Sequence, residues 1–169
     1  LYILEPSPPF RQEPLVSTLE AYFQGKKDLF GGLAMERWEK DWESYLVLHI
    51  DFSLTKYMEL TDLTGQLNLF LHRWEKIYGK DEAEKTASER LQGIILRASE
   101  QIGKQVVVLI DEYDAPLLDS NSDTALQQQL RNEMRKFFSP PQEVGAVSSL
   151  SLHHRHQQVQ PTEHLQRTE

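Results

Sequence analysis

The sequence predicts an α/β fold in which helices flank a parallel sheet. Two short apolar segments, YLVLHIDF at residues 45–52 and QVVVLI at residues 105–110, have the composition of buried strands. The segments before, between and after them repeat apolar residues at the spacing of amphipathic helices. Strands that alternate with helices favour parallel pairing, because each helix returns the chain to the starting edge of the sheet. At 169 residues, the chain has room for one domain.

The expected elements all fall within residues 15–139. In chain order they are a helix at 15–25, a short amphipathic segment at 35–42, a strand at 45–52, a helix at 63–79, a helix at 82–101, a strand at 105–110 and a helix at 124–138. The 63–79 helix has the clearest apolar face, formed by Leu63, Leu67, Phe70, Leu71, Trp74 and Ile77. Gly25, Gly79 and Gly103 each follow a helical pattern, where glycine readily ends a helix.

The two ends of the chain have a different composition. Residues 1–14 are rich in proline, which disfavours a helix there. Residues 140–169 are polar, rich in glutamine and histidine, and lack a helix-period apolar face, so we expect a disordered C-terminal tail. The sequence therefore predicts three parts: residues 1–14, an α/β domain at 15–139, and the tail at 140–169.

Composition and charge exclude several classes of function. The formal net charge of -8 makes nucleic acid an unlikely partner, because phosphate binding needs clustered lysine and arginine. The longest apolar run, Val106–Ile110, is far shorter than the roughly 20 residues that span a bilayer. The chain has no cysteine and no basic and apolar leader, so we expect a cytoplasmic protein without membrane segments. The identity of its partners stays unknown.

The aromatic and histidine side chains of the middle segment are expected to be structural. We expect the three tryptophans, Trp38, Trp42 and Trp74, to pack against other side chains. An acidic chain is not expected to bind nucleic-acid bases by aromatic stacking. His49 and His72 lie singly in a strand and a helix, and we expect them at the core edge or on the surface.

A pair of carboxylates follows the second strand, in the segment VVVLIDEYDAPLLD at residues 106–119. A buried strand that ends in Asp111 and Glu112 places both residues at the carboxyl edge of the sheet, where ligands bind in open α/β folds. In nucleotide hydrolases such a pair holds Mg²⁺ and activates the attacking water. A polar end to a buried strand explains the same residues without any catalytic role.

Three segments resemble, in order, the bacterial AAA-ATPase-like family of P-loop NTPases. They are LVSTLEAYFQGKKDLFGGLAMERWEKDW, LVLHIDFS and VVVLIDEYDAPLL, and the resemblance covers about residues 15–139. Members of this family commonly carry a PD-(D/E)XK nuclease-like domain after the ATPase. The resemblance implies an incomplete P-loop NTPase-type sheet, ATP and Mg²⁺ as cofactors, Asp111 and Glu112 as the catalytic Walker B acids, and Asp111 as the Mg²⁺ ligand. Asp114 and Pro116 match further signature positions of unassigned role.

The phosphate-binding loop of that family is not present in this sequence. The family usually has SRPRRFGKS before the first helix, whereas this chain has EPSPPFRQE at Glu5–Glu13. A phosphate loop needs glycine for close backbone approach, a lysine for the phosphate charge and a serine or threonine hydroxyl for Mg²⁺. Glu5–Glu13 has no glycine and no lysine, and it adds two carboxylates. We therefore expect that the chain as written binds neither ATP nor Mg²⁺.

Both unlike segments become similar to the family in a neighbouring reading frame. With suitable synonymous codons, Glu5–Pro14 read one base later gives SRPRRFGKS. Pro141–Gln160 treated in the same way gives LKKLGPYLRFLFITGISKFS, in which FLFITG resembles the strand that the family places beside the Walker B strand. We infer that about residues 5–14 and 141–169 are out-of-frame translations that flank an in-frame middle. Gene decay and sequencing error explain this equally well.

The frame hypothesis also accounts for the histidines of the tail. The run at His153, His154 and His156 arises when an ordinary apolar segment is read in the wrong frame, so we expect no metal site there.

Three interpretations of function remain open. The chain is a catalytically inactive AAA-ATPase-like fragment, a non-enzymatic module that binds a protein partner, or an active ATPase whose sequence is corrupted by two frameshifts.

Overall fold

The computed structural model describes residues 13–139 and 149–151 of the chain. Its helices are α1 (Glu13–Phe23), α2 (Ala34–Trp38), α3 (Leu60–Tyr78), α4 (Ala87–Ile102), α5 (Ala115–Asp119) and α6 (Thr124–Phe137), with short 3₁₀ helices η1 (Lys27–Phe30) and η2 (Phe52–Leu54). Its strands are β1 (Leu46–Asp51), β2 (Val106–Asp111) and β3 (Ser149–Ser151). The protein is therefore mixed α/β and predominantly helical, as the alternating pattern predicts.

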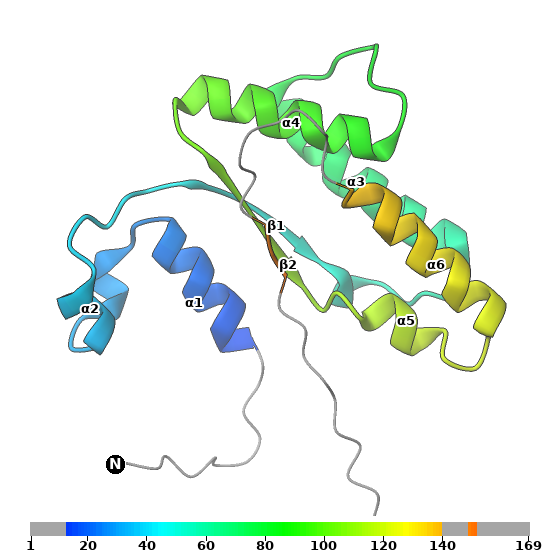
Figure 1. Ribbon diagram of the computed structural model, residues 1–169, viewed down its shortest axis with the longest axis horizontal. Coiled ribbons are helices and arrows are strands. Elements are labelled where there is room, and N and C mark those ends of the chain that lie inside the picture. Colours follow the sequence, from blue (N-terminus) through cyan, green and yellow to red (C-terminus); the bar gives the residue numbers. More distant parts are fainter. Residues whose placement is uncertain (1–12, 140–148, 152–169) are drawn as a thin grey trace, which may run out of the picture.

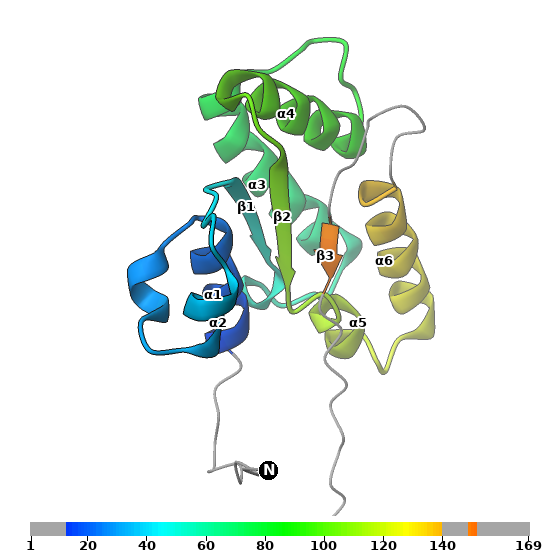
Figure 2. The same cartoon turned by 60° about the vertical axis from the view of Figure 1, so that its left-hand side comes forward.

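The strands β1 and β2 form the parallel pair that the sequence predicts. Their register runs from Leu46 opposite Val106 to Asp51 opposite Asp111. The three-residue strand β3 pairs parallel to β2 on its other side, so that β2 is central among the described strands (Figure 2). All five apolar residues of β2 are buried, which explains why this strand is a continuous hydrophobic run rather than an alternating one.

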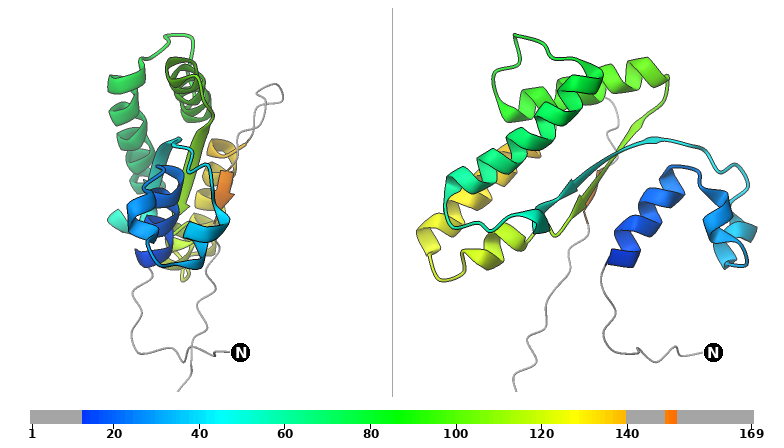
Figure 3. Two further views of the ribbon diagram at one scale, coloured as in Figure 1. Left: turned by 90° about the vertical axis from the view of Figure 1, so that its left-hand side faces the viewer. Right: turned by 180° about the vertical axis from the view of Figure 1, so that it is seen from behind.

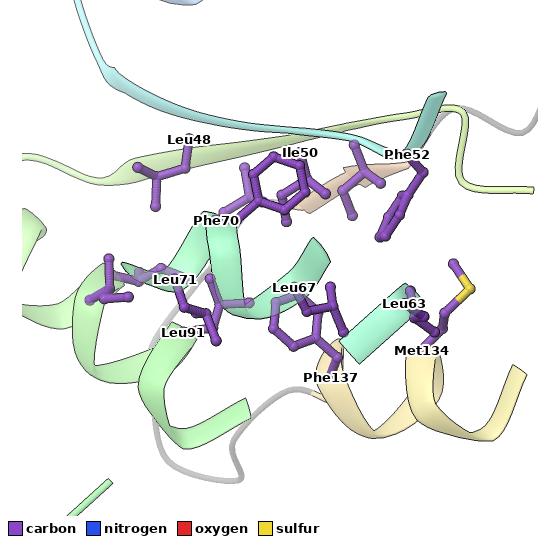
Figure 4. Close-up of a cluster of buried hydrophobic side chains, with 14 of the residues drawn as sticks. Leu48, Ile50, Phe52, Leu63, Leu67, Phe70, Leu71, Leu91, Met134 and Phe137 are labelled. Carbon is purple, nitrogen blue, oxygen red and sulfur yellow. The ribbon is translucent and has the colours of Figure 1, made fainter. Parts of the chain in front are cut away.

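Helices cover the two faces of the sheet unequally. α3, α4 and α6 lie on one face, whereas α1 lies on the other with α2 beside it (Figures 1 and 3). The larger core is formed between the sheet and the first three of these helices, and it includes Leu48, Ile50, Leu67, Phe70, Leu91 and Met134 (Figure 4). A smaller cluster joins Val16 of α1 to Val107 and Leu109 of β2. Successive residues of β2 therefore contribute to opposite faces.

Two helices begin at positions that composition alone does not predict. α4 starts at Ala87 and not near residue 82, because Thr86 and Glu89 form a reciprocal capping box at its start. α1 starts at Glu13, so the prediction that residues 1–14 exclude helix is wrong for its last two residues. Proline is tolerated in a first helical turn, where its missing N–H has no intrahelical partner in any case.

The predictions for the aromatic and apolar side chains need two corrections. Trp38 is 78% exposed, so the prediction that it packs in the interior is wrong. Trp74 packs against the larger core and Trp42 packs against Phe30, as expected. Ile77 is also largely exposed, whereas Trp74 and Tyr78 in the same turn pack against the larger core. His49 is half-buried and His72 is exposed, in agreement with the prediction.

The tail contains one element that its composition does not predict. Strand β3 (Ser149–Ser151) lies within the segment whose composition predicts disorder, and it pairs parallel to β2. The position beside β2 is the one expected for the family strand FLFITG. Residues 140–148 and 152–169, which include His153, His154 and His156, lie outside the described residues. Within the described residues, no helix is long and apolar enough to cross a membrane.

A buried ion pair links α3 to α4 and gives the fold a pH dependence. Arg90 donates two hydrogen bonds to the Glu75 carboxylate, with Nε–Oε1 at 2.6 Å and Nη2–Oε2 at 2.9 Å. These bonds hold the pKa of Glu75 below its ordinary value. The ionised form is therefore stabilised by folding, and this contribution is present above the unfolded pKa of about 4.3 and lost as the pH falls through the lower folded pKa.

We accordingly expect the free energy of unfolding to fall on acidification below about pH 4.3. Glu75→Gln should flatten this dependence, whereas the matched exposed variant Glu82→Gln should leave it unchanged. Urea denaturation followed by circular dichroism between pH 3 and pH 6 measures both. Equal pH profiles for the parent and Glu75→Gln would show that the ion pair does not carry the effect.

Candidate functional site at the carboxyl edge of the sheet

The predicted carboxylates lie together at the carboxyl edge of β2. Asp111 is the last residue of the strand, and Glu112 follows it; both are half-buried. Glu112 has a backbone φ of 49°, in the left-handed region that non-glycine residues seldom adopt. Its N–H donates a hydrogen bond of 3.0 Å to Oδ1 of Asp111. The turn therefore fixes one oxygen of Asp111 and redirects the chain immediately after the strand.

A third carboxylate lies at the same edge. Asp51, the last residue of β1, is the register partner of Asp111. Residues in register on parallel strands share a face, and alternation from Leu109 places both aspartates on the α1 face. The Asp51 side chain accepts a 2.8 Å hydrogen bond from the N–H of Ser53 at the start of η2. Asp51 is a strand end in the sequence, but its pairing with Asp111 depends on a register that the sequence does not reveal.

The helix α1 begins on the same side of the molecule. It runs back across its face of the sheet in the direction opposite to the strands, so that its first turn lies toward the edge where the strands end (Figures 1 and 3). A loop that precedes α1 would therefore approach Asp51 and Asp111. The predicted replacement of the phosphate loop at residues 5–14 lies almost entirely outside the described residues. Pro14, in the first turn of α1, has no N–H to donate.

The remaining signature positions have structural roles. Asp114 is the N-cap residue of α5, and its carbonyl oxygen accepts hydrogen bonds from the N–H groups of Leu117 and Leu118. Pro116 lies in the first turn of α5 and is buried. At the end of α5, Asp119 accepts hydrogen bonds from Lys56 Nζ at 3.0 Å and from the N–H of Tyr57 at 3.2 Å. The segment after Glu112 is thus a turn followed by the short helix α5. The last residue of α5 is held by hydrogen bonds to the segment that follows η2.

The donor set at this edge suits Mg²⁺ but does not suit the phosphates of ATP. Mg²⁺ is normally held by one or two carboxylates together with water and substrate phosphates. Asp111 could supply one such oxygen, but no group of three metal-binding side chains exists among residues 13–139. The phosphates would require N–H donors and a lysine before α1, where Glu5–Glu13 has neither a glycine nor a lysine. The carboxylates fit the metal, whereas the segment before α1 does not fit the phosphates.

Comparisons with known proteins identify the family of the chain. A family model described as "Predicted AAA-ATPase" matches residues 10–150. The chain belongs to the AAA-ATPase-like family. A curated relative, "Uncharacterized protein in vnfD 5'region" of Azotobacter chroococcum mcd 1, is 31% identical over 140 residues. The match covers 82% of this chain and 27% of the relative, so the chain spans about a quarter of that protein's length. No solved structure matches.

The site residues predicted from the sequence and those found in the structure overlap in part. The structure brings Asp111 and Glu112 to one edge, as the strand-end argument predicts, and adds Asp51 beside them. The structure therefore places three carboxylates at one edge of the sheet. The catalytic roles of Asp111 and Glu112, and the assignment of Asp111 as a Mg²⁺ ligand, stay predictions.

Proposed function

We propose that this chain is an AAA-ATPase-like domain, related to P-loop enzymes that bind and hydrolyse ATP, which does not itself bind ATP. The observation that carries the proposal is the segment before α1. It contains no glycine or lysine between Glu5 and Glu13, and Pro14 removes an N–H from the first turn. Family membership and the position of Asp111 support descent from a nucleotide-binding protein.

The physical reason is the balance of charge and hydrogen-bond donors. ATP carries several negative charges, which a phosphate loop offsets with backbone N–H groups, a lysine and the positive end of a helix. Here Glu5, before α1, and Glu13, the first residue of α1, add two further carboxylates. Asp51, Asp111 and Glu112 add three more at the edge that α1 faces. Without the metal, these carboxylates would therefore repel the phosphates. With the metal bound, the chain would still offer the phosphates too few hydrogen-bond donors.

Titration with a fluorescent ATP analogue tests the proposal directly. We expect no saturable binding at micromolar nucleotide in the presence of Mg²⁺, and no ATP hydrolysis above background. Glu112→Gln should then behave like the parent chain in both assays. A Mg²⁺-dependent Kd in the micromolar range, or ATPase activity that Glu112→Gln abolishes, would contradict the proposal.

A frameshift origin is the second part of the proposal. The neighbouring-frame translation of residues 5–14 gives a complete phosphate loop, and that of residues 141–169 gives an apolar strand at the position where β3 pairs with β2. Genomic DNA sequenced across codons 4–15 and around codon 140 distinguishes a decayed gene from a corrupted sequence. Codons whose neighbouring frame encodes neither SRPRRFGKS nor FLFITG would refute both forms of this idea.

A further inference from the structure

The longest helix of the described chain, α3, has one face that no other described element covers. Its opposite face packs in the larger core through residues such as Leu67 and Leu71. In the view from behind, α3 lies in front of α6, and no described element lies in front of α3 (Figure 3). We call the uncovered side the outer α3 face, and its members, all exposed, recur at helical spacing: Gly65, Leu69, His72, Arg73, Lys76 and Ile77.

The outer α3 face is basic, although the chain as a whole is acidic. It includes Arg73, Lys76 and the titratable His72, and it contains no carboxylate, whereas the full sequence has a formal net charge of -8. Within residues 13–139, neither Arg73 nor Lys76 forms an ion pair. The acidic residue beside them in the sequence, Glu75, is buried, and its carboxylate is bonded to Arg90. The positive charge of this face is therefore available to an acidic partner.

Two aliphatic side chains lie among these cations. Leu69 is 43% exposed and Ile77 is 64% exposed, and they lie about two turns apart on the same face. Apolar contacts surrounded by a polar rim are typical of protein–protein interfaces. A phosphate backbone would bury little of this aliphatic surface, because its contacts are made by charged and polar groups. The main apolar face of α3 is already buried in the core, so too little apolar surface remains for insertion into a lipid layer.

Gly65 lies on the same face and has no packing role within the described chain. Glycine in a helix interior destabilises the helix relative to alanine. At Gly93, in α4, that cost has a clear cause, because an added Cβ would collide with the carboxylate of Glu84. At Gly65, an added Cβ would meet no atom of another described element within 4 Å. A glycine there leaves room for the backbone of a second helix to approach closely.

We propose that the outer α3 face binds an acidic amphipathic helix of a partner protein. Apolar side chains of such a helix would pack against Leu69 and Ile77, and its carboxylates would pair with Arg73 and Lys76. Gly65 would lie under the partner's backbone at one end of the contact. The face contains none of the carboxylates at the edge of the sheet, so this proposal is independent of the proposal on ATP.

Two-dimensional ¹H–¹⁵N NMR of the full 169-residue chain tests the proposal with a synthetic helix as the probe. The probe has about three heptads, with leucine at positions a and d and glutamate at positions e and g. A peptide with lysine in place of every glutamate is the control. We expect saturable shifts of the α3 amide signals between Gly65 and Ile77 with the glutamate peptide, and none with the lysine peptide.

A charge exchange assigns the binding to the cations of this face. Arg73→Glu/Lys76→Glu should weaken binding of the glutamate peptide by about tenfold or more and should bind the lysine peptide instead. Arg131→Glu/Arg135→Glu reverses the same number of exposed charges on α6, and it should bind the glutamate peptide like the parent chain. Gly65→Ala should raise the midpoint of thermal unfolding and yet weaken binding, because the added methyl group holds the two helices apart.

The absence of saturable shifts with millimolar glutamate peptide would overturn the proposal, as would shifts confined to other elements. Unchanged binding by Arg73→Glu/Lys76→Glu or by Gly65→Ala would do the same. Tighter binding of this face to single-stranded DNA or to phosphatidylglycerol vesicles would assign it to a different class of partner. Dimerisation of the parent chain in analytical ultracentrifugation that Arg73→Glu/Lys76→Glu prevents would assign the face to a second copy of the chain.

Discussion

Exchange of Glu5–Glu13 for SRPRRFGKS, together with Pro14→Ala, is expected to give the chain Mg²⁺-dependent ATP binding. The exchange introduces a glycine, a lysine and a hydroxyl before α1, removes two carboxylates and restores an N–H in the first helical turn. Asp111 already lies at the edge that this loop would approach. We expect a Kd in the micromolar range against no measurable binding by the parent, a gain of at least about a thousandfold. A fluorescent ATP analogue measures both chains under the same conditions.

Two variants of the exchanged chain separate the roles of the carboxylates. Asp111→Asn should abolish the Mg²⁺ dependence of binding, because it removes the carboxylate predicted to hold the metal. Glu112→Gln should retain binding and lose hydrolysis, because it removes the group predicted to activate water. If the exchanged chain folds, as judged by circular dichroism, and still binds no nucleotide, the residues at this edge are not a nucleotide site.

Leu67→Ala is expected to remove a large part of the stability of the domain. Leu67 is 1% exposed and lies in the larger core, where α3 faces the sheet (Figure 4). Loss of a buried leucine side chain costs about 2–5 kcal/mol, because the cavity left behind collapses only partly. Whole domains are stable by about 5–15 kcal/mol, so this single change could unfold a substantial fraction of the protein at 37 °C.

Leu69→Ala provides the matched control on the same helix. Leu69 is 43% exposed and lies outside the core, so its truncation should change the free energy of unfolding by about 0.5 kcal/mol or less. Urea denaturation followed by the far-ultraviolet signal gives both values. Similar losses for the two variants would mean that α3 does not pack on the sheet through the face that includes Leu67.

The larger elements of the fold were predictable because their causes are local. The apolar run of β2 is too short for a buried helix, and the apolar spacing of α3 identifies the core face on which Leu67 lies. The exposure of Trp38 and Ile77 was not predictable, because apolar spacing does not show which residues of a helix the neighbouring elements cover. β3 was missed for a related reason, since its order comes from pairing with a distant strand.

The candidate sites divide in the same way. Asp111 and Glu112 follow a buried strand directly, so their place at a sheet edge could be inferred from order along the chain alone. Asp51 joins them only through the register of β1 with β2, which is a property of the folded state. The cavity at the opposite edge of the sheet brings together the end of α1 and the segment 39–45, and it includes a left-handed turn at Trp42 that the sequence does not indicate.

The left-handed backbone of Glu112 costs the folded state free energy. A non-glycine residue in this conformation costs about 1 kcal/mol, and glycine adopts it without that penalty. Such a residue persists only where its surroundings hold it in place. The turn at Glu112 therefore stores strain at the point where the chain leaves the sheet, whether or not the chain hydrolyses ATP.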